Sequence, residues 1–136
     1  MATILLVGTD EPLLEGVAQS LGAVGHGVRF AATFADAVEV ALAERPIVAI
    51  VSHALAADAR ALGIPLAPGG ALVLYRSGGA SERTASLAPA VVRGALADLT
   101  LPLERHRLIA LVAAVCERAR ATGRERRDTP PELRAY

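Results

Sequence analysis

Short apolar runs alternate along the chain with segments whose apolar residues recur at helical spacing. The runs cover residues 3–7, 28–32, 47–51, 71–75 and 97–100. Most of them are apolar at nearly every position instead of at alternate positions, which is typical of strands in a parallel sheet covered on both faces. The pattern therefore predicts five parallel strands that are connected by helices.

The first two segments between these runs carry clear helix signals. Apolar residues recur at helical intervals over 13–21, and Gly22 ends that segment. The next segment begins where Thr33 is followed three positions later by Asp36, a pattern that resembles a capping box. Pro46 stops this second helix, because the residue before a proline is pushed out of the helical region.

The later segments give weaker helix signals. Residues 54–62 predict a short third helix. The fourth helix contains Pro89 near its start and Gly94 near its end, and both residue types disfavour helix interiors. The last helix is expected to end at Gly123.

Alternating strands and helices of this kind predict a doubly wound (βα)5 sandwich around a five-stranded parallel sheet. Right-handed crossovers favour the flavodoxin-like strand order 2-1-3-4-5, here with a shortened third helix. One such domain would occupy residues 1–122. The polar residues 123–136, which include two prolines, would form a C-terminal tail or linker.

In doubly wound sheets the functional site lies beyond the carboxyl ends of the strands. The first strand is followed here by Gly8, Thr9 and Asp10, and the third by Ser52 and His53. A Ser–His nucleophile is disfavoured, because adjacent residues of a strand point to opposite faces. A phosphate-binding turn after the first strand is also disfavoured, because the Asp10 carboxylate would repel a phosphate.

The composition excludes several classes of function. The chain has 136 residues, of which 53% are hydrophobic and 21% are charged, enough for one domain with a core. Its formal net charge is zero, which argues against direct binding to nucleic acid. All 14 basic residues are arginine, so mechanisms that need a lysine are excluded.

The single cysteine, Cys116, excludes an internal disulfide and a multi-cysteine metal site. Its apolar neighbours predict that it is a small buried residue. The N-terminus lacks the features of a signal peptide, and no apolar stretch reaches the length of a membrane helix. We therefore expect a cytoplasmic protein that does not contact a membrane.

Two long stretches carry a resemblance to a known family. ILLVGTDEPLLEGVAQSLGAVGHGVRFAATFADAVEVALAERP (4–46) and GALADLTLPLERHRLIALV (94–112) resemble, in order and spacing, the response-regulator receiver domain of bacterial two-component signalling and phosphorelays. The resemblance covers residues 4–120. It implies the CheY-like form of the predicted fold and, in typical members, phosphorylation of an aspartate at a Mg²⁺ site.

The positions that carry this family's chemistry hold other residues in this chain. The two acidic metal-binding positions correspond to Gly8 and Thr9, and Asp10 is the only carboxylate just beyond them. The phosphorylated aspartate corresponds to Ser52, and the Thr or Ser that ends the fourth strand corresponds to Tyr75. Tyr75 either fills the space of the missing acidic cluster or points outward as a contact for a partner.

The lysine that pairs with the phosphoryl group corresponds to Leu101, and only the following Pro102 is kept. The resemblance implies a cis bond between these two residues. Mg²⁺ prefers carboxylate oxygens, so Asp10 alone would bind it weakly. Ser52 has no evident base, and Leu101 cannot neutralise a phosphoryl group. We therefore expect a degenerate pocket in a pseudo-receiver, which is not an enzyme, holds no metal or cofactor and works without phosphorylation of an aspartate.

The resemblance also implies where a partner binds. Receivers use the face made by the fourth helix, the fifth strand and the last helix for dimerisation or output. In this chain that face would include Leu87, Val91, Arg93, Arg105 and Arg107. We expect it to bind a signalling protein or an effector, or a second copy of the chain in a homodimer.

One other class of function stays open on the sequence. The crevice beside Gly8, Thr9 and Ser52 would also serve a flavodoxin-like module that binds a small molecule or a nucleotide. Such a module would retain an absorbing ligand through purification, whereas a pseudo-receiver would not.

Overall fold

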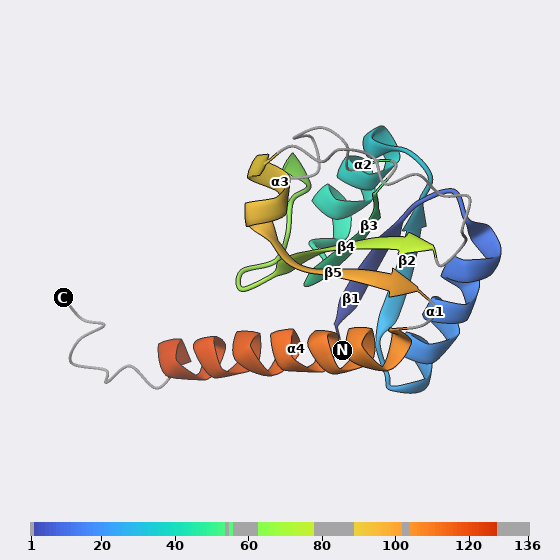
Figure 1. The fold of residues 1–136 in the computed structure, drawn as a ribbon. Coiled ribbons are helices and arrows are strands. Elements are labelled where there is room, and N and C mark those ends of the chain that lie inside the picture. The colour runs from blue at the N-terminus through green and yellow to red at the C-terminus, as the bar shows by residue number, and fades with distance from the viewer. Residues whose placement is uncertain (1, 54, 56–62, 78–88, 102–103, 128–136) are drawn as a thin grey trace.

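The computed structural model describes residues 2–53, 55, 63–77, 89–101 and 104–127. These residues form a sheet of five parallel strands in the order β2-β1-β3-β4-β5 (Figure 1). This order confirms the predicted doubly wound topology. The strands are β1 (Thr3–Val7), β2 (Gly27–Ala31), β3 (Val48–Ser52), β4 (Ala71–Ser77) and β5 (Ala95–Leu101).

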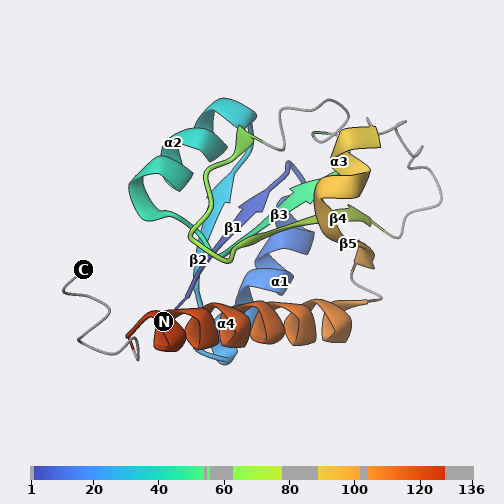
Figure 2. The ribbon, with the colours of Figure 1, turned by 90° about the vertical axis from the view of Figure 1, so that its left-hand side faces the viewer.

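Helices cover both faces of this sheet. Figures 1 and 2 show α1 and α4 on one face and α2 and α3 on the other. This three-layer arrangement explains why the strands are apolar at consecutive positions, since both faces must be buried. The described helices are α1 (Glu11–Ala23), α2 (Phe34–Glu44), α3 (Pro89–Gly94) and α4 (Arg105–Arg127).

Some predicted features fall on residues that the structure does not describe. The short third helix was expected over 54–62, of which only Leu55 is described. Pro102 and the peptide bond before it also lie outside the described residues. The connection from β3 to β4 runs over residues 53–70.

Helix α4 extends four residues farther than predicted. It runs to Arg127 instead of ending at Gly123. A glycine inside a helix costs about 1 kcal/mol relative to alanine, which is too little to end a helix whose neighbouring residues favour it. Residues 123–127 are therefore helical, and the division of the chain at residue 122 stays a prediction.

The ends of α2 show how local sequence sets the boundaries of a helix. The backbone N–H of Asp36 donates to the Thr33 hydroxyl oxygen over 3.2 Å, which confirms the predicted N-cap. At the other end Arg45 adopts a left-handed conformation with φ of 46°, and its N–H donates to the Ala41 carbonyl over 2.8 Å. Left-handed caps favour glycine, so Arg45 holds a conformation that is costly for a side chain.

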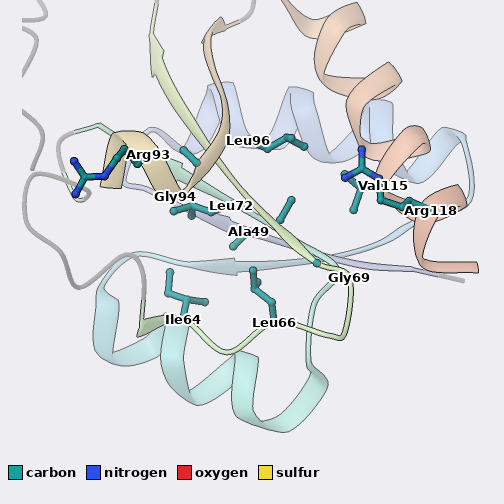
Figure 3. A pocket seen from close by; sticks show the side chains of 13 residues that line it. Ala49, Ile64, Leu66, Gly69, Leu72, Arg93, Gly94, Leu96, Val115 and Arg118 are labelled. Atoms are coloured by element: carbon teal, nitrogen blue, oxygen red, sulfur yellow. The ribbon is translucent and has the colours of Figure 1, made fainter. Parts of the chain in front are cut away.

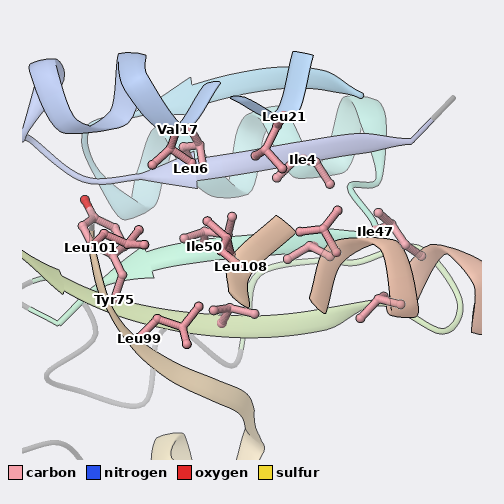
Figure 4. Close-up of a cluster of buried hydrophobic side chains, with 14 of the residues drawn as sticks. Ile4, Leu6, Val17, Leu21, Ile47, Ile50, Tyr75, Leu99, Leu101 and Leu108 are labelled. Carbon is pink, nitrogen blue, oxygen red and sulfur yellow. The ribbon is translucent and has the colours of Figure 1, made fainter. Parts of the chain in front are cut away.

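The core has two parts, one on each face of the sheet. Figure 4 shows the cluster between the sheet and the helices α1 and α4, with Ile4, Leu6, Ile50 and Leu108 among its members. Aliphatic side chains build most of it, as the low aromatic content predicted. Cys116 belongs to the same cluster, and burial raises the pKa of its thiol. It therefore packs as a small apolar residue.

The second cluster lies between the sheet and the helices α2 and α3. Its members include Leu5, Val7 and Leu74 from the strands and Ala37 from α2. Within the described ranges no helix is both long enough and apolar enough to cross a membrane.

The strained C-cap of α2 gives a first prediction. Replacing Arg45 with glycine should raise the free energy of unfolding by about 0.5–1 kcal/mol, because glycine adopts positive φ without steric cost. Arg45→Ala is the matched control, since alanine keeps the Cβ atom and should bring no such gain. Urea denaturation of the three proteins measures both values. An equal gain in both variants would show that the backbone at residue 45 is not strained.

Candidate functional site

The carboxyl ends of β1, β3 and β4 meet at one edge of the sheet. Val7 of β1 pairs with Val51 of β3, so Gly8 and Ser52 follow directly at adjacent strand ends. Ser52 in turn pairs with Tyr75 of β4. The structure therefore brings together three positions that the sequence placed in the degenerate pocket.

Tyr75 fills the space at this edge. Its side chain is only 2% exposed and belongs to the core cluster shared with α1 and α4. Figure 4 shows it beside Leu101. Of the two orientations considered for Tyr75, the structure shows the inward one.

Gly8 is the residue that admits the tyrosine. A Cβ atom added at Gly8 would collide with the Tyr75 hydroxyl and lie 3.3 Å from its Cζ atom. Gly8 does not have a positive φ, unlike Gly25 and Gly69. The glycine is therefore required by the space that Tyr75 occupies and not by the backbone conformation.

The other described residues of the expected pocket, Thr9, Asp10 and Leu101, do not face one common site. Thr9 and Asp10 are exposed, and the Asp10 side chain makes no capping hydrogen bond at the start of α1. Leu101 is fully buried in the core. Within the described residues no group of three or more His, Cys, Asp or Glu side chains is placed to hold a metal ion.

A partly buried polar pair lies next to the pocket, and sequence reasoning did not find it. The His53 Nε2 atom is 2.7 Å from the Asp98 Oδ1 atom, and the backbone N–H of His53 donates to the Tyr75 carbonyl over 2.8 Å. The side chain of His53 is 7% exposed and that of Asp98 is 39% exposed. The contact crosses β4. It joins His53, which directly follows β3, to Asp98 of β5, which pairs with Leu74 of β4.

A β-bulge explains why Asp98 can reach His53. Leu72 pairs with Ala95 but Val73 pairs with Ala97, so Leu96 is an extra residue in β5. Without it, Asp98 would pair with Tyr75 and its side chain would face the α1 and α4 side. The spacing of residues along the chain does not reveal such a register shift, so the contact between His53 and Asp98 could not be predicted from the sequence.

The predicted interaction face is only partly exposed. Arg93, Arg105 and Arg107 lie at the surface. Placing Val91 on that surface was wrong, because its side chain is 0% exposed and packs in the second core cluster. The short helix α3 uses this residue to attach to the sheet. Leu87 lies outside the described residues.

A cavity of about 450 Å³ opens at the start of β4 and β5 (Figure 3). Ile64, Leu66 and Leu72 give it an apolar lining. Figure 3 shows Arg93 and Arg118 at its two ends. It adjoins the face of α3, β5 and α4 and lies at the opposite strand ends from the Tyr75 pocket.

A second cavity of about 510 Å³ lies between α1 and α2, beside the end of β2. Leu14, Ala31 and Val40 contribute apolar atoms to it, and Phe30 at its edge is 50% exposed. Four carboxylates surround it, from Glu11, Glu15, Asp36 and Glu39. These negative charges would repel the phosphates of a nucleotide. They therefore disfavour the alternative of a nucleotide-binding module that uses the crevice beside Gly8.

No protein-family model and no curated protein matches the sequence. Solved structures are similar to it in fold. The response regulator receiver domain from Clostridium thermocellum gives a TM-score of 0.68 at 16% identity, over 90% of this chain and 99% of that one. A CheY-like receiver domain protein from Methanospirillum hungatei gives 0.64 at 20% identity, over 89% and 98%.

NtrX from Brucella abortus, in complex with ATP, gives a TM-score of 0.69 at 23% identity. The match covers 90% of this chain but 28% of the NtrX chain, so this chain is similar to one part of NtrX. Together these structures confirm the CheY-like fold.

The contact between Gly8 and Tyr75 gives the second prediction. Gly8→Ala should lower the free energy of unfolding by about 1–3 kcal/mol, as expected for an overpacked core. In a Tyr75→Phe background the same substitution should cost less, because the colliding hydroxyl is gone. A double-mutant cycle by chemical denaturation measures this coupling.

Gly16→Ala is the control for this cycle. Gly16 lies in α1 with nothing near the position of an added Cβ, so alanine should stabilise the helix there by about 1 kcal/mol. If Gly8→Ala costs the same with and without the Tyr75→Phe substitution, the hydroxyl does not occupy the space beside Gly8.

The pair of His53 and Asp98 gives the third prediction. Asp98→Ala should lower the free energy of unfolding by about 1–3 kcal/mol, because it leaves a buried imidazole N–H without an acceptor. Asp98→Asn keeps an acceptor oxygen and should lose less. Thermal and urea denaturation measure both. If Asp98→Ala costs no more than alanine at the exposed Glu117, the pair does not contribute to stability.

Proposed function

We propose that the protein is a pseudo-receiver that signals through protein–protein contact and without phosphorylation of an aspartate. The observation that carries this proposal is the buried Tyr75 side chain beside Gly8. It occupies the edge of the sheet where the receiver resemblance implies a metal and a phosphoryl group. The CheY-like fold supports the signalling class, and the replaced residues support the loss of the switch.

The chemistry of the remaining residues supports the same conclusion. Mg²⁺ dehydrates reluctantly and is bound through carboxylates, whereas Gly8 offers no ligand and Thr9 only a hydroxyl. A phosphoryl group at Ser52 would bring nearly two negative charges to a site without a lysine. Leu101, at the position of that lysine, is fully buried among apolar side chains. Among the described residues, the site therefore offers no aspartate as nucleophile, no pair of carboxylates for a metal and no lysine as countercharge.

The face formed by α3, β5 and α4 is the proposed contact surface. Arg93 and Arg107 are exposed on its two helices, and Leu96 at the bulge exposes an apolar side chain. Arg105 lies at the other side of α4, against Leu13 and Gly16 of α1. A signalling protein or effector with acidic and apolar side chains would be complementary to this face. We also propose that two copies can form a homodimer through the same face. The proposed location of the protein is the cytoplasm. The alternative of a nucleotide-binding module gains no support from the acidic cavity beside Gly8.

Amide NMR spectra test this proposal directly. The resonances of Thr9, Ser52 and Tyr75 should stay in place when millimolar Mg²⁺ and then a beryllofluoride phosphoryl mimic are added. The melting temperature should also not rise with Mg²⁺, because the site gains no ligand. A receiver domain with its full set of acidic residues serves as the positive control. Joint, saturable shifts of the three residues and of α4 would contradict the proposal.

A further inference from the structure

The two edges of the sheet differ in how regular their outer strands are. β2 and β5 are the outer strands. In β5 the bulge at Leu96 interrupts the register, and bulges are one of the features that keep an edge strand from pairing with another chain. β2 pairs with β1 in an unbroken register over all five of its residues, and it contains no proline. Its free edge therefore keeps the regular backbone that a further strand needs for pairing.

Two residues of β2 direct their backbone groups to this free edge. The N–H of Gly27 and the carbonyl oxygen of Ala31 form hydrogen bonds with the residues that flank β1, so both groups point into the sheet. Successive residues of a strand direct these groups to opposite edges, so those of Val28 and Phe30 point outward. No strand among the described residues lies on that side of β2. Val28 and Phe30 therefore each offer an N–H donor and a carbonyl acceptor to a strand of another chain.

The acidic cavity, which lies between α1 and α2, opens at the carboxyl end of this edge. The two helices cover opposite faces of the sheet (Figures 1 and 2), and both line the cavity together with Phe30 and Ala31 of β2. A cavity that touches both helices and β2 must pass round this outer strand near its carboxyl end. A strand added beside β2 would therefore have one of its ends at the cavity.

Negative charge surrounds this corner of the sheet. The four carboxylates that line the cavity belong to Glu11 and Glu15 of α1 and to Asp36 and Glu39 of α2. All four residues are exposed, and within the described part of the chain none of them takes part in an ion pair. The carboxylates of α1 lie at one face of the sheet and those of α2 at the other. A strand at this edge would therefore meet negative charge on both of its own faces.

A second copy of the chain does not match the charge of this edge. The β2 strand of a second copy would bring one basic side chain, Arg29, which already lies 2.7 Å from Glu44. The other side chains of that strand are uncharged, so such a pairing would leave the carboxylates of both copies without a countercharge. The edge therefore suits a different protein, one that supplies arginine or lysine side chains.

We propose that the free edge of β2 binds an extended basic segment of a partner protein, which adds to the sheet as a further strand. The backbone of the segment bonds to Val28 and Phe30, and its arginine or lysine side chains reach the carboxylates of the acidic cavity. The ring of Phe30 is half exposed and offers a surface on which a guanidinium can stack. This contact lies at the opposite edge of the sheet from the α3–β5–α4 face and does not depend on the pseudo-receiver role.

Amide hydrogen exchange along β2 tests the backbone part of this contact. The probe is a short synthetic peptide in which arginine and valine alternate. In the free protein the amides of Val28 and Phe30 should exchange rapidly, because no strand supplies an acceptor for them. Saturating peptide should slow their exchange about tenfold or more. The amides of Gly27, Arg29 and Ala31 point into the sheet, so their exchange should change less.

A methylated peptide separates strand addition from simple attraction between charges. It carries the same side chains, but every backbone nitrogen is methylated, so it cannot donate to the edge of β2. Fluorescence anisotropy of labelled peptides should show that it binds about tenfold more weakly than the unmodified probe. Equal affinity of the two peptides, or unchanged exchange at Val28 and Phe30, would overturn the proposal. Exchange at these two amides that slows with protein concentration alone would also overturn it, because the occupant would then be a second copy.

Matched variants test the side chains of the contact. Glu15→Lys reverses one charge of the acidic cavity and should weaken binding of the unmodified probe about tenfold. Glu117→Lys makes the same change at an exposed position of α4 outside the cavity and should leave the affinity unchanged. Phe30→Pro removes an outward N–H and should weaken binding more than Phe30→Ala, which removes the ring but keeps the N–H. Circular dichroism spectra establish that the variants are folded. If Glu15→Lys and Glu117→Lys bind the probe alike, the acidic cavity is not part of the docking site and the proposal is wrong.

Discussion

The Tyr75 side chain can enter the core only because residue 8 has no side chain. In a site built from clustered carboxylates, like charges raise one another's pKa and oppose folding unless a cation is bound. In this protein the same edge of the sheet is filled by a tyrosine ring, with Leu101 buried nearby. This edge of the sheet therefore belongs to the apolar core. The conformation of the strand ends therefore rests on packing and not on the occupancy of a site.

Much of the fold could be predicted from the sequence because both faces of the sheet are covered. Residues 4–7 and 48–51 are buried at every position, and a continuous apolar run is the pattern that such burial requires. The start and the end of α2 could be predicted from Thr33 and Pro46. A capping hydrogen bond and the steric effect of a proline depend only on neighbouring residues and not on the tertiary structure. The positions of Gly8, Ser52 and Leu101 could also be predicted from the sequence, because each residue ends a strand or directly follows one.

The features that were missed depend on interactions between distant residues. The pair of His53 and Asp98 joins residues 45 positions apart, and it exists because one extra residue at Leu96 shifts the register of β5. Val91 is buried because it packs in the cluster between the sheet and the helices α2 and α3. The acidic cavity combines side chains from α1 and α2 whose separation in the sequence does not indicate that they share a groove. Each case required the relative placement of two elements, which local patterns do not contain.

The link from His53 to Asp98 also matters for the edge of the sheet. β5 is an edge strand, and such strands are the first to detach and the first to pair with strands of other chains. The bond crosses β4 and fastens β5 to a strand in the interior of the sheet. Detaching β5 then requires that a largely buried imidazole lose its partner at the same time. The hydrogen bond therefore adds to the free energy that local opening of β5 requires, and so opposes exposure of this edge strand to other chains.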